Sequence, residues 1–188
     1  MSYITKIFSQ WENDILADQE RAICFSGHRP SKLPDGNASL LISDLERAII
    51  FKIQQGKRTF INGCMAGFDI LAGESVLKLR QIYPPILCVT VAPFRIGYFK
   101  SKNWTADWKK RALEVYNASD MAFSLTEEYR PGIYYARNDF MLAHASGVVC
   151  YYTGRITGTK GKGDKGGGTQ YTVNRAFDID LDIHNLHK

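Results

Sequence analysis

Five short apolar runs, each nearly continuous rather than alternating, constrain the fold more than any other feature of this sequence. Turn residues bound the runs, which are spread along the chain from residue 23 to residue 152. They are Ile23–Phe25, Thr59–Ile61, Ile86–Val91, Met121–Leu125 and Val148–Tyr152. Continuous apolar runs are typical of strands that are covered on both faces, as in a parallel sheet between layers of helices. The runs therefore predict a parallel sheet.

Segments with helical periodicity lie between the runs. Leu41, Leu45, Ala48, Ile49 and Ile53 form one apolar stripe, and we expect this helix to end at Gly56. The other expected helices cover residues 67–79, 104–115, 134–145 and 169–177, and residues 179–183 are expected to add a last short strand. This alternation predicts a doubly wound α/β fold, with a mainly parallel sheet of about five to six strands flanked by helices.

The first twenty residues stand outside this alternation. Ile4, Ile7, Phe8, Trp11 and Ile15 are spaced as in an amphipathic helix, so residues 1–20 are expected to form an N-terminal extension. That helix would cap the sheet or pack against a second copy of the chain in a homodimer. The remainder, residues 21–188, is expected to form a single domain, because 188 residues is the size of one core.

Composition excludes several classes of protein. Hydrophobic residues make up 45% and charged residues 23%, which is ordinary for a globular protein. No apolar run approaches the roughly 20 residues that cross a bilayer, and the N-terminus has no signal-peptide core, so we expect a cytoplasmic protein. Four scattered cysteines form no C-x-x-C pair, and the histidines show no ligand spacing, so we expect no disulfide framework, metal or cofactor.

The net charge of +5 is concentrated in one glycine-rich segment. Residues 154–168 contain four basic residues, one acidic residue and seven glycines. A positive excess gathered in one place favours a single anionic ligand over a nucleic-acid-binding surface spread across the protein. We therefore rank nucleic acid as a disfavoured partner without excluding it. For residues 154–165, a flexible surface loop with solvated lysines is the better interpretation.

Residues that directly follow the expected strands are the candidates for a binding site, because parallel sheets bind ligands beyond the carboxyl ends of their strands. Glycine permits close approach of the backbone, and the amides at a helix N-terminus bind anions. The candidates are Ser26, Gly27, His28, Arg29, Gly63, Gly67, Asp69, Pro93, Phe94, Gly167, Gly168 and Thr169. Gly167–Thr169 would form a phosphate cradle, with the threonine hydroxyl contributing. The strand-to-helix turn that contains Gly63 and Gly67 is not G-x-G-x-x-G, so a standard nicotinamide site is not supported there. The glycine-rich segment 154–168 lacks the G-K-[ST] ending of a P-loop, which disfavours P-loop ATP hydrolysis.

Four further interpretations stay open on spacing alone. Asp69 could hold a sugar hydroxyl or cap a helix. Arg137, followed by Asn138 in the helix after a tight turn, could bind a phosphate or carboxylate or form a salt bridge. His28 could act as an acid or base, or be a hydrogen-bonded structural residue. The tyrosines 98, 134 and 135 could stack on a base, and Trp104 and Trp108 are expected in the core.

Taken together, these motifs resemble the SLOG superfamily, and most of all its YpsA-like branch. The motifs are S-G-H-R-P, G-C-M-A-G-F-D-I-L-A-G-E, A-P-F, A-R-N-D-F-M-L and G-G-G-T, in that order between about Arg21 and Ile183. The resemblance implies a Rossmann-like fold that binds nucleotides or nucleotide-derived small molecules. Relatives include the cytokinin-activating phosphoribohydrolases (LOG proteins), the single-strand DNA-binding DprA proteins and sensor domains for NAD-derived signals.

The resemblance also assigns roles to residues. Gly63, Gly67 and Asp69 would contact the sugar and phosphate, and Gly167, Gly168 and Thr169 would hold a phosphate. Arg137 takes the place of the arginine in the LOG-type R-x-x-x-M helix, with Met141 as the methionine.

One departure from the LOG pattern limits the analogy. LOG hydrolases carry a catalytic glutamate three positions beyond the threonine, whereas this chain has Thr172 there. Loss of a general acid or base typically costs ~10²–10⁴-fold in rate, so the LOG mechanism is disfavoured. We therefore expect a module that binds a nucleotide or a derivative such as an ADP-ribose-like molecule.

Two alternatives remain. The first is an N-glycosidic hydrolase acting on a nucleotide or nucleoside, with Asp69, Glu74 or Arg137 as catalytic candidates, and whether the chain is an enzyme at all stays open. The second, ranked lower, is single-stranded DNA binding of the DprA type, for which the pI of 9.0 is the argument.

Overall fold

The computed structural model describes residues 10–34, 38–83, 85–102, 104–158 and 167–187. Within these residues, six strands form one sheet in the order β4-β3-β2-β1-β5-β6, and all neighbours are parallel. The strands are β1 (Ala22–Gly27), β2 (Thr59–Asn62), β3 (Leu87–Phe94), β4 (Met121–Thr126), β5 (Gly147–Tyr151) and β6 (Asp182–Asn185). The predicted doubly wound, Rossmann-like α/β fold is confirmed.

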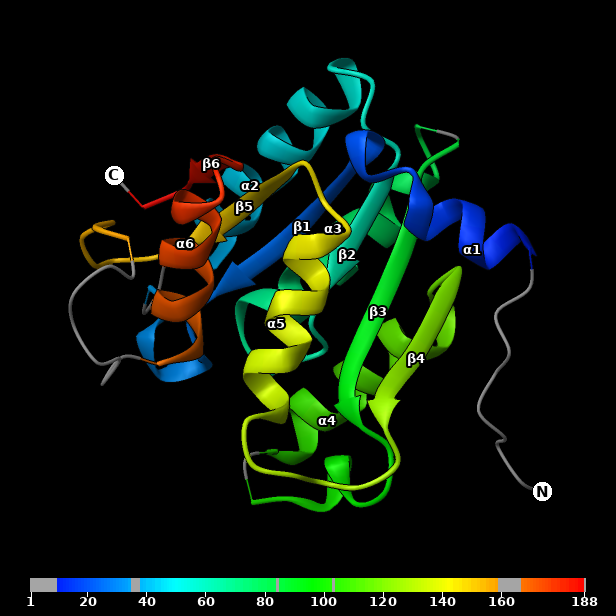
Figure 1. Ribbon diagram of the computed structural model, residues 1–188, viewed down its shortest axis with the longest axis vertical. Coiled ribbons are helices and arrows are strands. Elements are labelled where there is room, and N and C mark those ends of the chain that lie inside the picture. Colours follow the sequence, from blue (N-terminus) through cyan, green and yellow to red (C-terminus); the bar gives the residue numbers. More distant parts are fainter. Residues whose placement is uncertain (1–9, 35–37, 84, 103, 159–166, 188) are drawn as a thin grey trace.

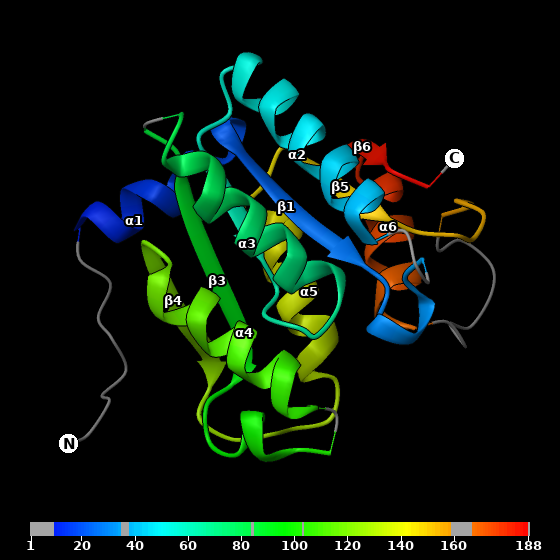
Figure 2. The ribbon, with the colours of Figure 1, turned by 180° about the vertical axis from the view of Figure 1, so that it is seen from behind.

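Helices cover both faces of the sheet. α2 (Ala38–Gln54), α3 (Phe68–Arg80) and α4 (Ala106–Ala118) lie on one face, which Figure 2 shows in front. α5 (Ile133–Ala143) and α6 (Gly168–Asp178) lie on the other (Figure 1). α1 (Gln10–Ala17) adds Ile15 and Leu16 to the core on the α5 side. Three short 3-10 turns, Gln19–Arg21, Pro30–Lys32 and Tyr98–Lys100, complete the described elements.

The apolar stripe of α2 packs as its spacing predicts. Leu41, Leu45, Ala48, Ile49 and Ile53 are all buried, in one cluster with residues of β1, β2 and α3. Burial of a leucine or isoleucine side chain is worth about 1.5–3 kcal/mol, so this stripe is sufficient to fix α2 on the sheet. The continuous apolar runs of β1, β2 and β5 are buried along their lengths because helices cover both their faces.

Among the element boundaries that differ from the prediction, two have a clear local cause. The last strand begins at Asp182 rather than Ile179, because Ile179 is the C-cap of α6 and Asp180 turns the chain with a positive φ of 56°. α4 begins at Ala106 rather than Trp104, because the Thr105 hydroxyl accepts a hydrogen bond from the Trp108 amide at 3.3 Å and caps the helix. Residues 1–9 of the expected amphipathic helix lie outside the described residues.

The four cysteines are buried, and none is paired with another. Cys24, Cys88 and Cys150 lie on strands β1, β3 and β5, and Cys64 lies in the loop after β2. Burial raises the pKa of Cys64 to about 12 and that of Cys88 to about 11. All four therefore behave as small hydrophobic residues in the core.

Two further expectations concern membrane-spanning helices and the basic glycine-rich segment. Among the helices of the described residues, none combines the length and hydropathy needed to span a membrane. The lysines 160, 162 and 165, which carry most of the predicted basic segment, lie outside the described residues.

Candidate functional site

A cavity of about 620 Å³ opens at the carboxyl edge of the sheet, beside the ends of β1 and β5. The strand order reverses there, because β2, β3 and β4 follow β1 on one side whereas β5 lies on its other side. Doubly wound proteins bind ligands at such a reversal, in pockets of about 300–1,000 Å³. Figure 1 shows β1, α5 and α6 converging on this edge.

Most of the residues that the sequence singled out line this cavity. They come from the end of β1 and the segment after it, the first turn of α3, the N-terminal half of α5 and the first turn of α6. They are Ser26, Gly27, His28, Arg29, Asp69, Arg137, Asn138, Gly167, Gly168 and Thr169. Gly63, Gly67, Pro93, Phe94 and Glu74 do not line it.

The first turn of α6 forms one wall. Gly167 is the N-cap and the helix begins at Gly168, with no acidic residue in its first turn. The first amides of a helix have no intrahelical acceptor, and the helix dipole is positive at this end. Gly168 offers its backbone to the cavity without a side chain. This wall can therefore accept an anionic group.

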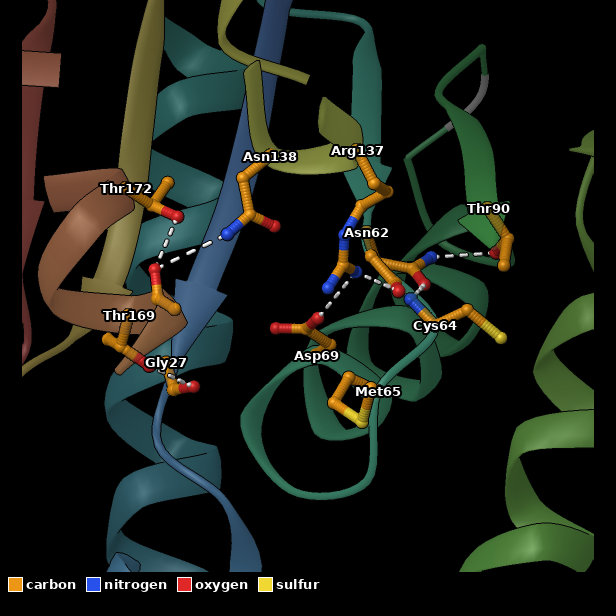
Figure 3. Close-up of polar contacts among 12 residues, drawn as sticks. Gly27, Asn62, Cys64, Met65, Asp69, Thr90, Arg137, Asn138, Thr169 and Thr172 are labelled. Carbon is orange, nitrogen blue, oxygen red and sulfur yellow. Dashed lines mark hydrogen bonds and ion pairs between the residues drawn. The ribbon is translucent and has the colours of Figure 1, made fainter. Parts of the chain in front are cut away.

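Contacts to β1 and α5 hold this turn in place (Figure 3). The Thr169 hydroxyl donates to the Gly27 carbonyl at 2.7 Å. Asn138 Nδ2 and the Thr172 hydroxyl donate to the Gly168 carbonyl at 3.3 Å and 2.8 Å. The Thr169 hydroxyl thus has a structural hydrogen bond, while its predicted contact with a phosphate stays a prediction, and the backbone amides are further donors for an anion.

Asp69 and Arg137 form a buried ion pair in the wall between α3 and α5. Arg137 Nη1 lies 3.4 Å from Asp69 Oδ2, and the two residues are 5% and 7% exposed. The same guanidinium donates to the Gly63 carbonyl, whereas the buried Nε has no hydrogen-bond partner among the described residues. Figure 3 shows the second carboxylate oxygen of Asp69 pointing away from this pair, toward Thr169 and Gly27. Of the two open interpretations of Arg137, the salt bridge is present.

Burial raises the pKa of Asp69 from 3.8 to about 6, and the nearby charges of Arg137 and Arg29 only partly oppose this rise. Asp69 is therefore a carboxyl group that changes its protonation state within about one unit of neutral pH. Its position in the cavity wall places that titration next to any bound ligand.

Asp69→Asn is expected to change how stability depends on pH. A raised pKa means that the folded protein binds more protons than the unfolded chain between about pH 4 and pH 6. Ionisation of Asp69 thus destabilises the wild type as the pH rises through this window, by about 3 kcal/mol at about 1.4 kcal/mol per unit of pKa. In urea denaturation of both proteins at pH 4, 5, 6 and 7, the free energy of unfolding of the variant should increase relative to that of the wild type as the pH rises. A difference that is independent of pH would contradict the assignment.

His28 connects the loops that follow β1 and β5. The Thr153 amide donates to His28 Nε2 at 3.2 Å, and the Thr153 hydroxyl lies 3.0 Å from the same atom. Since Nε2 accepts a hydrogen bond from the amide, the ring is neutral with its proton on Nδ1. Burial and the charge of Lys32 lower the pKa of His28, which agrees with a neutral ring. These contacts favour the structural interpretation of His28.

Arg29 and Lys32 supply exposed positive charges to the cavity. Both line it from the segment after β1 and are exposed. In the described part of the chain neither side chain forms an ion pair within 4 Å, in contrast to Arg137. Their charges are therefore available to a ligand.

Gly63 and Gly67 shape the site without lining it. A Cβ on Gly63 would overlap the Arg137 guanidinium and lie 2.6 Å from Asp69 Oδ2. Gly67 has a φ of +105°, and a Cβ there would lie 2.5 Å from the His28 carbonyl oxygen. These glycines thus position Arg137 and the segment after β1, whereas the sequence predicted direct ligand contacts.

Three other candidate residues make their contacts outside the cavity. Phe94 packs its ring against Tyr98 and Tyr129, and the Pro93 carbonyl accepts a hydrogen bond from Thr126. Glu74 forms a bidentate ion pair with Arg111 of α4, with both contacts at 2.7 Å. Glu74 therefore faces α4, away from the cavity, and is not carried into the functional proposal.

Several cavity residues were not singled out by the sequence. Lys32, Met65, Tyr152, Thr153 and Gln170 also line the cavity, as does Met141, which the family resemblance matched to the LOG-type methionine. Thr153 and Tyr152 follow β5 directly and Met65 lies in the loop after β2, so their place after a strand was the available signal. Methionine itself gave no chemical signal for binding, because it is usual in a core.

The parallel sheet and the cavity at its strand-order reversal define a Rossmann-like α/β protein with a ligand pocket of ordinary size. The chain belongs to the YpsA family, described as the YspA SLOG family, whose model matches residues 23–181. The match begins at the second residue of β1 and ends just before β6.

The names of two similar curated proteins state no activity. The chain is 27% identical over 135 residues to the uncharacterized SPbeta prophage-derived protein YoqJ of Bacillus subtilis, covering 64% of this chain and 77% of that protein. It is 28% identical over 139 residues to the UPF0398 protein lin2003 of Listeria innocua, covering 70% and 75%.

Two solved structures of DNA processing protein A (DprA) share the fold. The Streptococcus pneumoniae protein superposes with a TM-score of 0.53 at 15% identity, over 92% of this chain and 51% of its own length. The Helicobacter pylori protein, whose structure concerns single-stranded DNA binding, gives 0.55 at 15% identity, over 93% and 68%. The chain thus spans about half of the first and two thirds of the second.

Proposed function

We propose that this protein binds a nucleotide or a nucleotide-derived small molecule, such as an ADP-ribose-like molecule, in the cavity beside β1 and β5. A phosphate would lie against the first turn of α6. The observation that carries the proposal is the convergence of Gly27, Arg29, Gly168 and Asn138 on one cavity at the strand-order reversal. Membership of the SLOG family supports the binding of a small molecule.

The charges around the cavity support an anionic ligand. Arg29 and Lys32 contribute two positive charges, and the N-terminus of α6 adds its dipole. The charge of Arg137 is largely offset by Asp69, so this pair adds little net attraction. Because exposed charges are screened by salt, affinity for the ligand should fall as ionic strength rises.

Gly168→Asp tests the location of the phosphate. An aspartate in the first turn of a helix is compatible with its dipole, and among the described residues a Cβ at this position has only Asn138 Nδ2 nearby, at 3.5 Å. The variant should therefore fold, while its carboxylate repels a phosphate. Calorimetry with AMP, ADP-ribose and NAD should show at least about a hundredfold loss of affinity, since a like charge in a binding site costs several kcal/mol.

Gly168→Asn is the matched control, since it has the same shape without the charge. It should lose much less affinity than Gly168→Asp. If Gly168→Asp bound these ligands as tightly as the wild type, the phosphate would lie elsewhere. Mass spectrometry of small molecules released from the denatured protein would identify the ligand itself.

Asp69 favours one second candidate, an N-glycosidic hydrolase. It lines the cavity, and its pKa of about 6 suits a group that exchanges a proton near neutral pH. Thr172, which replaces the LOG-type glutamate, is buried and donates to the Gly168 carbonyl, so it supplies no acid or base. Incubation with nucleoside monophosphates and NAD, followed by chromatography, tests this candidate. Base released by the wild type but not by Asp69→Asn would support it, and no release from any substrate would remove it.

Binding of single-stranded DNA keeps the lowest rank. The similarity to DprA proteins shows the fold alone at 15% identity. Single-strand binders combine a basic groove with successive stacking rings, whereas the cavity described here has two exposed cations, Arg29 and Lys32, beside it.

A further inference from the structure

The aromatic residues of the cavity differ in how accessible their rings are. Five line it: Phe25, His28, Tyr134, Tyr135 and Tyr152. Phe25 is fully buried, and Tyr152 is 6% exposed. Tyr134 is half-buried, with its ring packed against Phe94 and Tyr129. Tyr135 is 39% exposed, so among these rings it offers the most surface to a ligand.

Neighbouring side chains hold the Tyr135 ring in place. Tyr171 of α6 packs against it edge to face, with 4.8 Å between ring centroids and 67° between planes. The Tyr171 hydroxyl in turn donates to the Asp139 carboxylate of α5, with oxygens at 2.7 Å and 2.9 Å. A single neighbouring ring cannot cover both faces of Tyr135, so part of a positioned aromatic surface remains at the cavity.

Tyr135 and Gly168 line the same cavity. The ring partner of Tyr135, Tyr171, lies three residues beyond Gly168, about 4.5 Å along the axis of α6. A ligand with its phosphate against Gly168 can therefore extend toward the Tyr135 ring, with a sugar between its phosphate and its base.

Resting on the function proposed above, we propose that Tyr135 determines specificity by stacking against the planar base of the ligand. The ligand class is then a phosphorylated ribose that carries an aromatic heterocycle, rather than a sugar phosphate alone. Stacking uses the ring face and reads no hydrogen-bond pattern, so Tyr135 selects for the presence of a base more than for its identity.

Calorimetry with AMP and ribose 5-phosphate separates the base from the phosphate. Tyr135→Ala should lower the affinity for AMP by about tenfold to a hundredfold, in line with the usual contribution of one stacked base. Its affinity for ribose 5-phosphate should stay within about twofold of that of the wild type. Tyr135→Phe keeps the ring and should bind AMP nearly as well as the wild type. Tyr129→Ala, a change of an exposed tyrosine outside the cavity lining, is the control and should bind both probes normally.

The outcomes distinguish this inference from the proposed function. An equal loss for AMP and ribose 5-phosphate in Tyr135→Ala would show a structural role and overturn the inference alone. Unchanged affinity for AMP in that variant would do the same. Wild-type protein that binds neither probe would overturn the proposed function and the inference together.

Discussion

Arg137→Met is expected to lower the free energy of unfolding by about 3–5 kcal/mol at pH 8, the usual cost of removing one partner from a buried ion pair. Methionine has a similar length but no charge, so the buried carboxyl group of Asp69 would lose its counter-ion. The Gly63 carbonyl would also lose its hydrogen bond from the guanidinium. Urea denaturation followed by circular dichroism measures the loss.

Two further variants show whether the loss comes from the uncompensated carboxylate. Adding Asp69→Asn to Arg137→Met removes the negative charge and should recover much of the stability. Arg95→Met removes an arginine whose ion pair with Glu127 is exposed, so its stability should stay close to that of the wild type. A double variant as unstable as Arg137→Met would mean that packing, rather than charge, accounts for the effect.

Gly67→Ala is expected to cost about 2–5 kcal/mol, because it combines backbone strain with a steric overlap. With φ +105° and ψ −133°, Gly67 has a conformation that is essentially restricted to glycine. The added Cβ would also lie 2.5 Å from the His28 carbonyl oxygen. That carbonyl accepts a hydrogen bond from the Phe68 amide at 3.1 Å, so the overlap falls where α3 meets the segment after β1.

Gly97→Ala is the matched control for backbone strain alone. Gly97 has a φ of +78°, and a Cβ there would have no atom of the described residues within 4 Å. Its expected cost is about 1–2 kcal/mol, the penalty for the left-handed conformation. Equal losses for the two variants, measured by urea denaturation, would show that the contact between Gly67 and His28 has no steric importance.

The sequence predicted the fold well because the physical signal for this architecture is local. A strand covered on both faces needs a continuous apolar run, and β1, β2 and β5 contain Ile23–Phe25, Phe60–Ile61 and Val148–Tyr151. The last strand was placed three residues too early because Ile179 looks like a strand residue. Its place at the end of α6 depends on the turn at Asp180, which apolar patterning does not reveal.

The candidate site was predicted in part, for a reason that follows from sheet topology. Residues after strands were expected to gather at one edge, and Ser26, His28 and Gly168 do line one cavity. Pairing across the chain was not predictable, since Asp69 and Arg137 are far apart in sequence and either could have had another partner. Phe94 also follows the rule about strand ends, but β3 lies two strands from the reversal and its end belongs to an aromatic cluster.

The buried cysteines can report on local opening of the segments that surround them. A thiol reacts as the thiolate, and burial holds the pKa of each thiol above its ordinary value of 9.0. An alkylating reagent should therefore modify these side chains only after the surrounding segment opens. With reporters on β1, β3, β5 and the loop after β2, the rate of labelling can compare the opening of the sheet with that of the Gly63–Gly67 loop, without the introduction of any foreign probe.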